Sequence, residues 1–154
     1  MDKMNSIEIR KAEIQDLEDL SLIFDEYRIF YKKPSDPKGA KEFLLDRFVN
    51  FQSHIYLAIK KETNLIIGFT QLYPTFSSLS MARAVILNDL YVREEFRKLG
   101  IAKSLLQYVK NYAKLSNLKY IELSTAITNK KAQSLYESLG FERDTEFYHY
   151  SLIV

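Results

Sequence analysis

The stretch Arg97-Lys98-Leu99-Gly100-Ile101-Ala102 carries residues whose types and spacing suit an anion-binding turn. It follows an apolar run that is typical of a buried strand, and it precedes apolar residues at steps of three and four, which indicate an amphipathic helix. Backbone N–H groups and the dipole at a helix start attract negative charge. Gly100 would let a ligand approach the backbone closely. This pattern predicts a phosphate-binding turn, with an ordinary strand-to-helix turn as the alternative.

A second stretch with chemical potential is 129–141, which opens on Asn129 and ends on Gly140 and Phe141. Asn129 is placed to cap a short helix, and Gly140 to end it. Between them, Tyr136 offers a phenol, whose reference pKa of about 10 keeps it protonated at neutral pH. On structural grounds alone, Tyr136 could instead pack against neighbouring side chains.

Strands and helices must position these two stretches. Hydrophobic periodicity and turn residues predict them in chain order. The expected strands are 7–12, 54–60, 65–73, 82–92, 120–125, 141–143 and 147–152, and the expected helices are 14–31, 40–51, 100–115 and 129–139.

This order of elements indicates the fold class. Strands 54–60 and 65–73 are separated by a short turn and should form a hairpin. Strand 82–92, the following helix and strand 120–125 form a βαβ unit, so those two strands should be parallel. The sequence therefore predicts an α/β fold: one domain, residues 1–154, with a mixed central sheet flanked by about four helices.

Composition excludes several classes of function. A net charge of +2 without a lysine tract argues against nucleic-acid binding. The chain has no cysteine, and His54 and His149 are too few for a histidine cluster, so we expect no metal site. Four glycines do not supply a dinucleotide fingerprint or a Walker loop. The apolar runs are too short for a membrane span or a signal peptide, so we expect a cytoplasmic protein without membrane partners.

The turn at 97–102 and the stretch 129–141, in this order, resemble the two signature motifs of the GNAT superfamily of N-acetyltransferases, which use acetyl-CoA. Ile9 to Ala12 followed by Asp16 resembles the family's opening strand and helix, so the resemblance extends over essentially the whole chain. It implies a GNAT fold in which the central strand splays from the next parallel strand, with acetyl-CoA in the resulting cleft.

The resemblance also assigns roles toward acetyl-CoA. It implies that the Leu90 N–H meets the thioester carbonyl, where an acyl transfer needs a fixed donor. The other implied cofactor contacts are the backbone of Tyr91 and Val92, the amides of Arg97, Lys98, Leu99, Gly100, Ile101 and Ala102 around the pyrophosphate, and the side chain of Asn129.

Two further roles concern charge and proton transfer. Lys98 and Lys103 are candidates for the 3′-phosphate, or they are plain solvated lysines. Tyr136 would protonate the leaving thiolate as general acid.

The general base is left open. Glutamates that serve some family members match Ile86 and Ser124 here, and neither residue can act as a base. The remaining candidates are Asp89 on the central strand and Glu122 on its neighbour. A carboxylate in so apolar a strand is costly unless it is paired or functional. Asp89 is therefore a base or a hydrogen-bonded structural group, and a water chain or no dedicated base are further alternatives.

Aromatic residues suggest the acceptor. Tyr27 and Tyr31 close the first helix and Tyr73 precedes the central strand, regions that form the acceptor side in the family. With Asp89, such rings suit a small-molecule amine. They could equally be core residues, and a protein or peptide amine stays open as acceptor. A non-catalytic acyl-CoA-binding regulatory protein is the alternative to an enzyme, and a homodimer is one alternative for the oligomeric state.

Overall fold

The computed structural model describes residues 6–154, which divide into two compact units. Unit 1 runs to Leu123 and unit 2 spans Ser124–Val154; each is described by itself. In chain order, unit 1 contains β1 (Ile7–Lys11), the short 3-10 helix η2 (Ile14–Asp16), α1 (Leu17–Phe30), α2 (Pro37–Val49), β2 (His54–Lys60), β3 (Leu65–Ser77), β4 (Ala82–Val92), the 3-10 helix η3 (Glu94–Phe96), α3 (Ile101–Leu115) and β5 (Ile121–Glu122), and unit 2 contains α4 (Lys130–Ser138).

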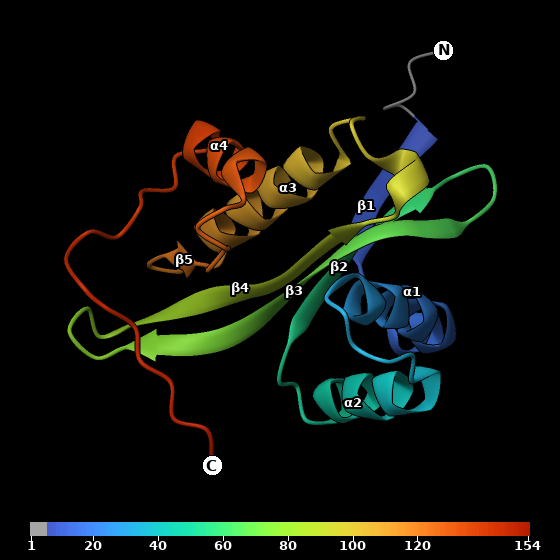
Figure 1. The fold of residues 1–154 in the computed structure, drawn as a ribbon, viewed down its shortest axis with the longest axis horizontal. Helices are drawn as coiled ribbons and strands as arrows, with labels where there is room; N and C mark the ends of the chain where they lie inside the picture. Colours follow the sequence, from blue (N-terminus) through green and yellow to red (C-terminus); the bar gives the residue numbers. More distant parts are fainter. Residues whose placement is uncertain (1–5) are drawn as a thin grey trace. The chain divides into compact units, whose positions relative to one another are not determined.

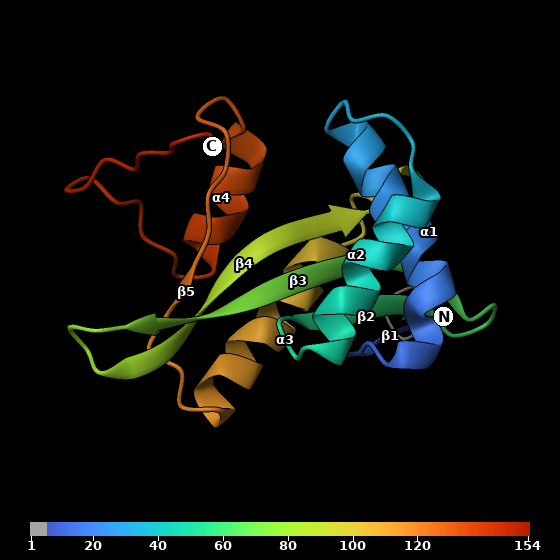
Figure 2. The ribbon, with the colours of Figure 1, turned by 90° about the horizontal axis from the view of Figure 1, so that it is seen from below.

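The sheet of unit 1 has the strand order β1-β2-β3-β4-β5. The first four strands are antiparallel to their neighbours, and β5 is parallel to β4. Figures 1 and 2 show β3 and β4 running side by side as the longest ladder. The predicted hairpin, the parallel pair and the mixed α/β sheet are therefore confirmed.

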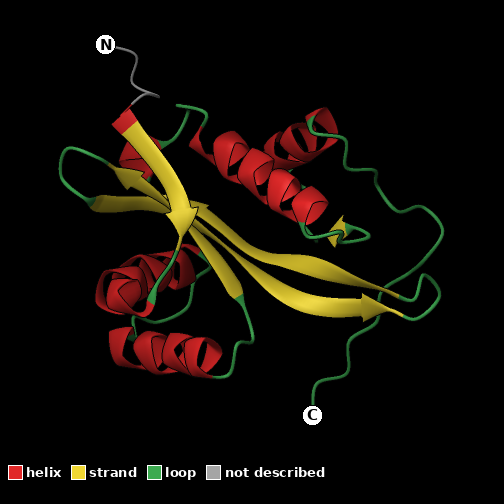
Figure 3. Ribbon diagram, turned by 180° about the vertical axis from the view of Figure 1, so that it is seen from behind, coloured by secondary structure: helices red, strands yellow, loops and turns green. Residues whose placement is uncertain are grey.

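Helices cover both faces of this sheet. α1 and α2 pack together on one face, and α3 lies on the other (Figures 1 and 3). α1 buries Leu20, Ile23 and Phe24 against the sheet. α3 shows the predicted stripe, since Ile101, Leu105 and Val109 are almost completely buried. A helix with one apolar stripe gains stability by burying it, and the sheet offers an apolar surface on each side.

A capping arrangement explains why α2 begins earlier than predicted, at Pro37 rather than at residue 40. The Asp36 side chain accepts a hydrogen bond from the Gly39 N–H at 2.9 Å. Pro37 occupies the first turn, where a missing N–H costs nothing. The linker before it is held by the buried Asp25, which accepts hydrogen bonds from Ser35 Oγ and the Asp36 N–H at 2.7 Å each.

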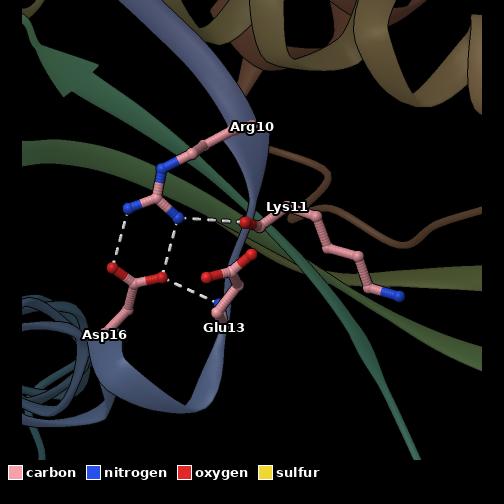
Figure 4. A network of polar contacts seen from close by, with 4 residues as sticks. All are labelled: Arg10, Lys11, Glu13 and Asp16. Carbon is pink, nitrogen blue, oxygen red and sulfur yellow. Dashed lines mark hydrogen bonds and ion pairs between the residues drawn. The ribbon is translucent and has the colours of Figure 1, made fainter.

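An ion pair fixes the passage from β1 to α1 (Figure 4). Both Arg10 amino groups donate to the two carboxylate oxygens of Asp16 at 2.8 Å. Asp16 also accepts the Glu13 N–H at 2.8 Å, and Arg10 reaches the Lys11 carbonyl at 3.0 Å. The Arg10 hydrogen bond is the main cause that lowers the pKa of Asp16, and burial opposes it. This bidentate pair orients the first helix relative to the sheet edge.

Two irregularities distinguish the central ladder from the prediction. β3 continues through Pro74 to Ser77, although the strand was predicted to end at residue 73. Its partner β2 pairs only as far as Leu72, so Pro74 lies where β3 has an open side and needs no donor there. The β3–β4 register shifts so that Gln71 pairs with Asp89 and Leu72 with Leu87, which leaves Asn88 as a β-bulge.

Unit 2 consists of α4 and an extended C-terminal segment. α4 has the predicted cap, because Asn129 Oδ1 accepts the Ala132 N–H at 3.1 Å, and Gly140 follows at φ +96°. The predicted strands 141–143 and 147–152 are wrong: in the structure these residues form no ladder. Alternating apolar residues favour an extended chain, but a strand also needs a hydrogen-bonding neighbour. Phe147, Tyr148 and Tyr150 are strongly exposed.

Candidate active site

The parallel pair of β4 and β5 is short. Only Val85 and Ile86 of β4 pair with β5, through Ile121 and Glu122. β4 then runs on from Leu87 to Val92, paired with β3 but not with β5. We call Leu87–Val92 the open edge. This geometry matches the predicted splayed pair of parallel strands.

The backbone groups that face the open edge follow from the register. Arg93 N–H donates to the Ile67 carbonyl at 2.8 Å, so the backbone of Arg93 faces β3. Backbone groups alternate along a strand, so Tyr91 also faces β3, whereas Leu90 and Val92 face away from it. The Val92 carbonyl is used by Arg97 Nε at 2.9 Å. The N–H groups of Leu90 and Val92 thus point to the side where β5 is missing.

The turn after β4 delivers the chain to the start of α3. Lys98 has φ +64°, and Gly100 forms the N-terminal cap with φ +79°. A Cβ at Gly100 would meet no atom within 4 Å, so glycine is required by its backbone conformation and not by crowding within the protein. The first turn of α3 contains no acidic residue. Its leading N–H groups have no acceptor within the helix and suit a phosphate.

The predicted basic residues of this turn divide into two groups. Lys98 and Lys103 are exposed near the start of α3. The Arg97 guanidinium instead lies over the rings of Phe30 and Tyr91, at 5.0 and 5.5 Å from their centroids. Arg97 therefore braces the turn against α1, while its backbone belongs to the turn before the helix start.

Asp89 is the buried carboxylate of the open edge. It is 4% exposed and lies on β4 opposite Gln71, directly after the bulge. Gln71 Nε2 donates to Asp89 Oδ2 at 2.6 Å, and Asn88 Nδ2 donates to Oδ1 at 3.1 Å. Gln71 is 0% exposed, and its Oε1 has no hydrogen-bond partner among residues 6–154. A buried acceptor without a partner is costly, which makes it a candidate ligand contact.

The predicted tyrosines surround this carboxylate. Burial raises the pKa of Tyr27, and the charge and hydrogen bonding of Asp89 raise it further. Burial raises the pKa of Tyr73 to about 12, again with a contribution from Asp89. Tyr31 is 58% exposed, and its ring meets Tyr27 edge-on at 5.1 Å. We call Tyr27, Tyr31, Gln71, Tyr73 and Asp89 the Asp89 cluster.

The structure thus brings together the four predicted acceptor residues, Tyr27, Tyr31, Tyr73 and Asp89. They come from α1, β3 and β4. The alternative carboxylate, Glu122, is exposed on β5 opposite Ile86. Asp89 is therefore the better placed of the two candidate bases, because its charge acts on the phenols of both Tyr27 and Tyr73.

A pocket of about 350 Å³ lies beside this cluster, at the end of β4. It is lined by Glu26, Ile29, Phe30, Tyr91, Glu94 and Arg97. Tyr91 and Phe69 link it to Tyr27 through ring contacts of about 6 Å. None of the predicted acceptor residues lines the pocket itself.

Sequence reasoning missed Gln71 and Arg47. Gln71 carried a signal, because it is a polar residue inside the apolar run of β3. Arg47 carried none, since an arginine on an exposed helix is ordinary. Its charge lowers the pKa of Tyr73, against the effects of burial and Asp89, so α2 also contributes to the site.

Asn129 and Tyr136 lie in unit 2. Asn129 acts as the helix cap described above, and the Tyr136 ring packs 5.8 Å from Phe141. Between residues 6 and 154, no group of three or more His, Cys, Asp or Glu side chains could hold a metal ion. Within the same range, no helix is both long and apolar enough to cross a membrane.

Comparisons with known proteins agree with this geometry. The sequence profile described as "Acetyltransferase (GNAT) family" matches residues 20–141. The chain is 47% identical over 146 residues to the uncharacterized N-acetyltransferase YhfO of Bacillus subtilis (strain 168), covering 95% of this chain and 97% of the relative. It is 28% identical over 144 residues to the D-amino-acid N-acetyltransferase HPA3 of Saccharomyces cerevisiae, covering 92% and 89%.

A solved structure is similar over the same range. The crystal structure of a probable acetyltransferase superposes with a TM-score of 0.91 at 42% sequence identity, covering 96% of this chain and 97% of that one. Fold, splayed strands and sequence similarity point the same way: the chain belongs to the acetyltransferase (GNAT) family and is an acetyl-CoA-dependent N-acetyltransferase.

Proposed function

We propose that this enzyme transfers the acetyl group of acetyl-CoA to a small primary amine by direct attack. The observation that carries the proposal is that Asp89 belongs both to the open edge and to the Asp89 cluster. Tyr91 of the open edge contacts Tyr27 of the cluster at 6.0 Å between ring centroids. A thioester along the edge and an amine in the cluster would therefore be neighbours, as direct transfer requires.

The open edge and the start of α3 supply the cofactor contacts in this proposal. Acetyl-CoA would bring a thioester whose carbonyl is open to attack. The Leu90 N–H would donate to the oxygen that gains negative charge, and it is fixed in the strand before the reaction begins. Val92 N–H would pair with the pantetheine arm. The amides of Arg97 to Ala102 would hold the pyrophosphate, with Lys98 or Lys103 near the 3′-phosphate.

Asp89 would take the proton that the amine must lose. Tyr27 and Tyr73 have raised pKa values, so at neutral pH they stay protonated and can donate but not accept a proton. Gln71 and Asn88 each donate to one carboxylate oxygen, and Tyr27 also hydrogen-bonds to Asp89, which together still leave one of about four lone-pair sites for the proton. The amine nitrogen forms the bond to the acetyl carbon, the carbon–sulfur bond breaks, and Tyr136 would return a proton to the thiolate.

The acceptor class rests on chemistry and on one relative. Aromatic faces and phenol oxygens suit an ammonium group. HPA3 is named for acting on D-amino acids, which are small amines. Free-thiol release from acetyl-CoA over a panel of small amines tests the proposal. Activity on a folded protein or peptide with none on any small amine contradicts this acceptor, and thiol release from no acceptor at all favours an acyl-CoA-binding regulatory role.

The proposed acid is tested separately. Tyr136→Phe removes one hydroxyl and almost no volume. If Tyr136 protonates the thiolate, kcat falls by roughly 10²- to 10⁴-fold while the KM for acetyl-CoA stays near its wild-type value. An unchanged kcat returns Tyr136 to a packing role against Phe141.

A further inference from the structure

Arg47 on α2 has a guanidinium group with incomplete partners. Its side chain is 24% exposed, and its Nε is buried with no hydrogen-bond partner among the described residues. The ion pair with Asp46 measures 3.8 Å between Nη2 and Oδ2, which is too long for a hydrogen bond. The guanidinium stacks 4.5 Å from the Phe43 centroid, and Phe43 stacks on Phe24. Packing against Phe43 therefore holds the guanidinium in place, while its Nε–H has no hydrogen-bond acceptor among the described residues.

A partner for such a group is an anion with two parallel acceptors. An arginine offers Nε–H and Nη–H as a planar fork that matches a carboxylate. A buried N–H without an acceptor costs free energy, and a carboxylate bound to Nε and Nη would remove that cost. The neighbouring Asp46 is on the same helix turn and does not reach Nε.

Arg47 lies within electrostatic reach of the Asp89 cluster. Phe69, Gln71 and Tyr73 alternate onto one face of β3. On that face, Phe69 contacts Phe24, and Phe24 stacks on Phe43, which lies beneath the Arg47 guanidinium. The pKa of Tyr73 agrees with this arrangement, because burial and the charge of Asp89 raise it and the charge of Arg47 lowers it. An acceptor bound against Tyr73 would therefore be subject to both the negative charge of Asp89 and the positive charge of Arg47.

Beside Asp89, the cluster has a hydrogen-bond acceptor that could bind an amine. Gln71 Oε1 is buried without a hydrogen-bond partner among residues 6–154, next to Asp89 Oδ2, which Gln71 Nε2 already holds. An ammonium group has three N–H donors in its compact head. Asp89 and Gln71 Oε1 could accept two of them, which would satisfy the buried amide oxygen.

We infer that the acceptor is an amino acid, whose amine binds Asp89 and Gln71 while its carboxylate binds Arg47. The inference rests on the proposed function, because it names the substrate class of the same site. It extends that function by assigning a carboxylate-binding residue on α2, a helix from which the sequence predicted no site residue. Arg47 is here a specificity-determining contact and takes no part in the proton transfers.

The experiment compares acceptors that differ only by a carboxylate: lysine with cadaverine, tyrosine with tyramine, and β-alanine with ethylamine. Thiol release at fixed acetyl-CoA gives kcat/KM for each. The amino acid of at least one pair should exceed its decarboxylated partner by more than tenfold. Arg47→Gln should lower kcat/KM for that amino acid by roughly 10- to 100-fold, mainly through KM, and change the plain amine by less than about threefold.

Lys38→Gln is the matched control, since it removes the same charge from the same helix at an exposed position. The kcat/KM of this variant for every acceptor should stay within about twofold of the wild-type value. Arg47→Lys keeps the positive charge but lacks the two parallel N–H donors of arginine. Its kcat/KM for the amino acid should therefore lie between those of Arg47→Gln and the wild type.

Two results overturn the inference while the proposed function stands. In the first, every plain amine has a kcat/KM equal to or higher than that of its amino acid. In the second, Arg47→Gln lowers kcat/KM equally for the amino acid and for its decarboxylated amine. If no amine releases thiol, the proposed function fails, and calorimetry then decides the inference. Binding of an amino acid to the wild-type protein with CoA that is lost in Arg47→Gln supports the site, and no binding to the wild type overturns it.

Discussion

The open edge and the Asp89 cluster share Asp89 of β4 but act through different kinds of groups. The open edge and the start of α3 present backbone N–H groups, set by a strand that loses its neighbour after Ile86 and by a glycine cap at Gly100. The Asp89 cluster presents side chains from α1, β3 and β4, with Arg47 of α2 nearby.

This difference predicts how the two regions tolerate change. Backbone contacts depend on conformation, so most side chains at the open edge can vary without loss of cofactor binding. Side-chain contacts depend on each residue, so the Asp89 cluster can change its acceptor through single substitutions. Substitutions in the cluster should therefore alter the amine kinetics alone, and substitutions that change the turn conformation should alter acetyl-CoA binding alone.

The largest expected effect is that of Asp89→Asn, which keeps the shape and removes the charge. If Asp89 takes the proton, kcat should fall by roughly 10²- to 10⁴-fold, with the KM for acetyl-CoA unchanged. The measurement is a pH–rate profile with an acceptor whose amine is already neutral at pH 6, so that the acidic limb belongs to the enzyme. If the pH–rate profile keeps its shape and only the stability of the fold drops, Asp89 has a structural role. Glu122 is then the next candidate base to test.

Next in size is Gly100→Val at the cap of α3. At about 100 times its Kd, acetyl-CoA should stabilise the wild type by about 2.7 kcal/mol, or roughly 5–10 °C in Tm. Valine at φ +79° distorts the turn and places a side chain where the pyrophosphate would lie, so this rise should vanish.

The matched control for this substitution is Gly140→Val, because Gly140 also has a positive φ and open space around a Cβ. It carries the same backbone strain but should keep the acetyl-CoA shift. Loss of the shift in both variants would mean that strain, and not the cofactor contact, is responsible.

A smaller effect is expected from Tyr73→Phe, which removes the phenol whose pKa responds to the charges of Asp89 and Arg47. We expect the KM for the amine to rise about 3- to 10-fold, since one hydrogen bond is lost. The KM for acetyl-CoA should stay within about twofold. Tyr31→Ala tests the exposed rim of the cluster in the same assay. Equal effects on both substrates would contradict the separation of the two regions.

The smallest effect concerns the Arg10–Asp16 pair. The pKa of Asp16 is lowered in the folded state, so its stabilising contribution is present above the unfolded pKa and is lost as pH falls through the folded value. Asp16→Asn should reduce the free energy of unfolding at pH 7 by roughly 0.5–1 kcal/mol, because the pair is partly exposed. The free energy of unfolding should also decline less steeply below about pH 4 in this variant than in the wild type. Urea unfolding at a series of pH values measures both effects.

The same pair orients α1, which carries Tyr27 and is capped at its C-terminus by Tyr31. Asp16→Asn should therefore raise the KM for the amine about twofold and leave the KM for acetyl-CoA unchanged. Asp144→Asn, in unit 2, is the control: it also removes a carboxylate with a lowered pKa and should change neither KM. A shift in the acetyl-CoA KM alone would contradict the assignment of α1 to the acceptor side.

Much of this architecture was predictable from local patterns. Strands 54–60 and 82–92 were predicted with the bounds that the structure shows, because alternating or continuous apolar residues are bounded by turns on both sides. The start of α3 was predictable because Gly100 and the helical stripe are neighbours in sequence. The splay of β4 from β5 came from the family resemblance, and the structure confirms it.

What could not be predicted depends on contacts between distant residues. Simple alternation along β4 places Asp89 and Tyr91 on the face of Leu87, whereas the bulge at Asn88 moves both to the face of Ile86. No local pattern announces that bulge, the extension of β3 past Pro74 or the approach of Arg47. The tail at 141–154 alternates like a strand, but whether a strand forms depends on a partner that the tail's own sequence does not specify.

The bulge at Asn88 makes chain length at this position matter more than residue type. The pairs on either side of Asn88 are already in register with β3, so deleting this one residue would keep Asp89 and Tyr91 on their present face. The same deletion would remove the local twist and straighten β4 directly after its last pair with β5. We expect a single-codon deletion to extend the parallel pairing and close the open edge, which would give a folded protein that keeps its amine-binding side chains but no longer admits a thioester.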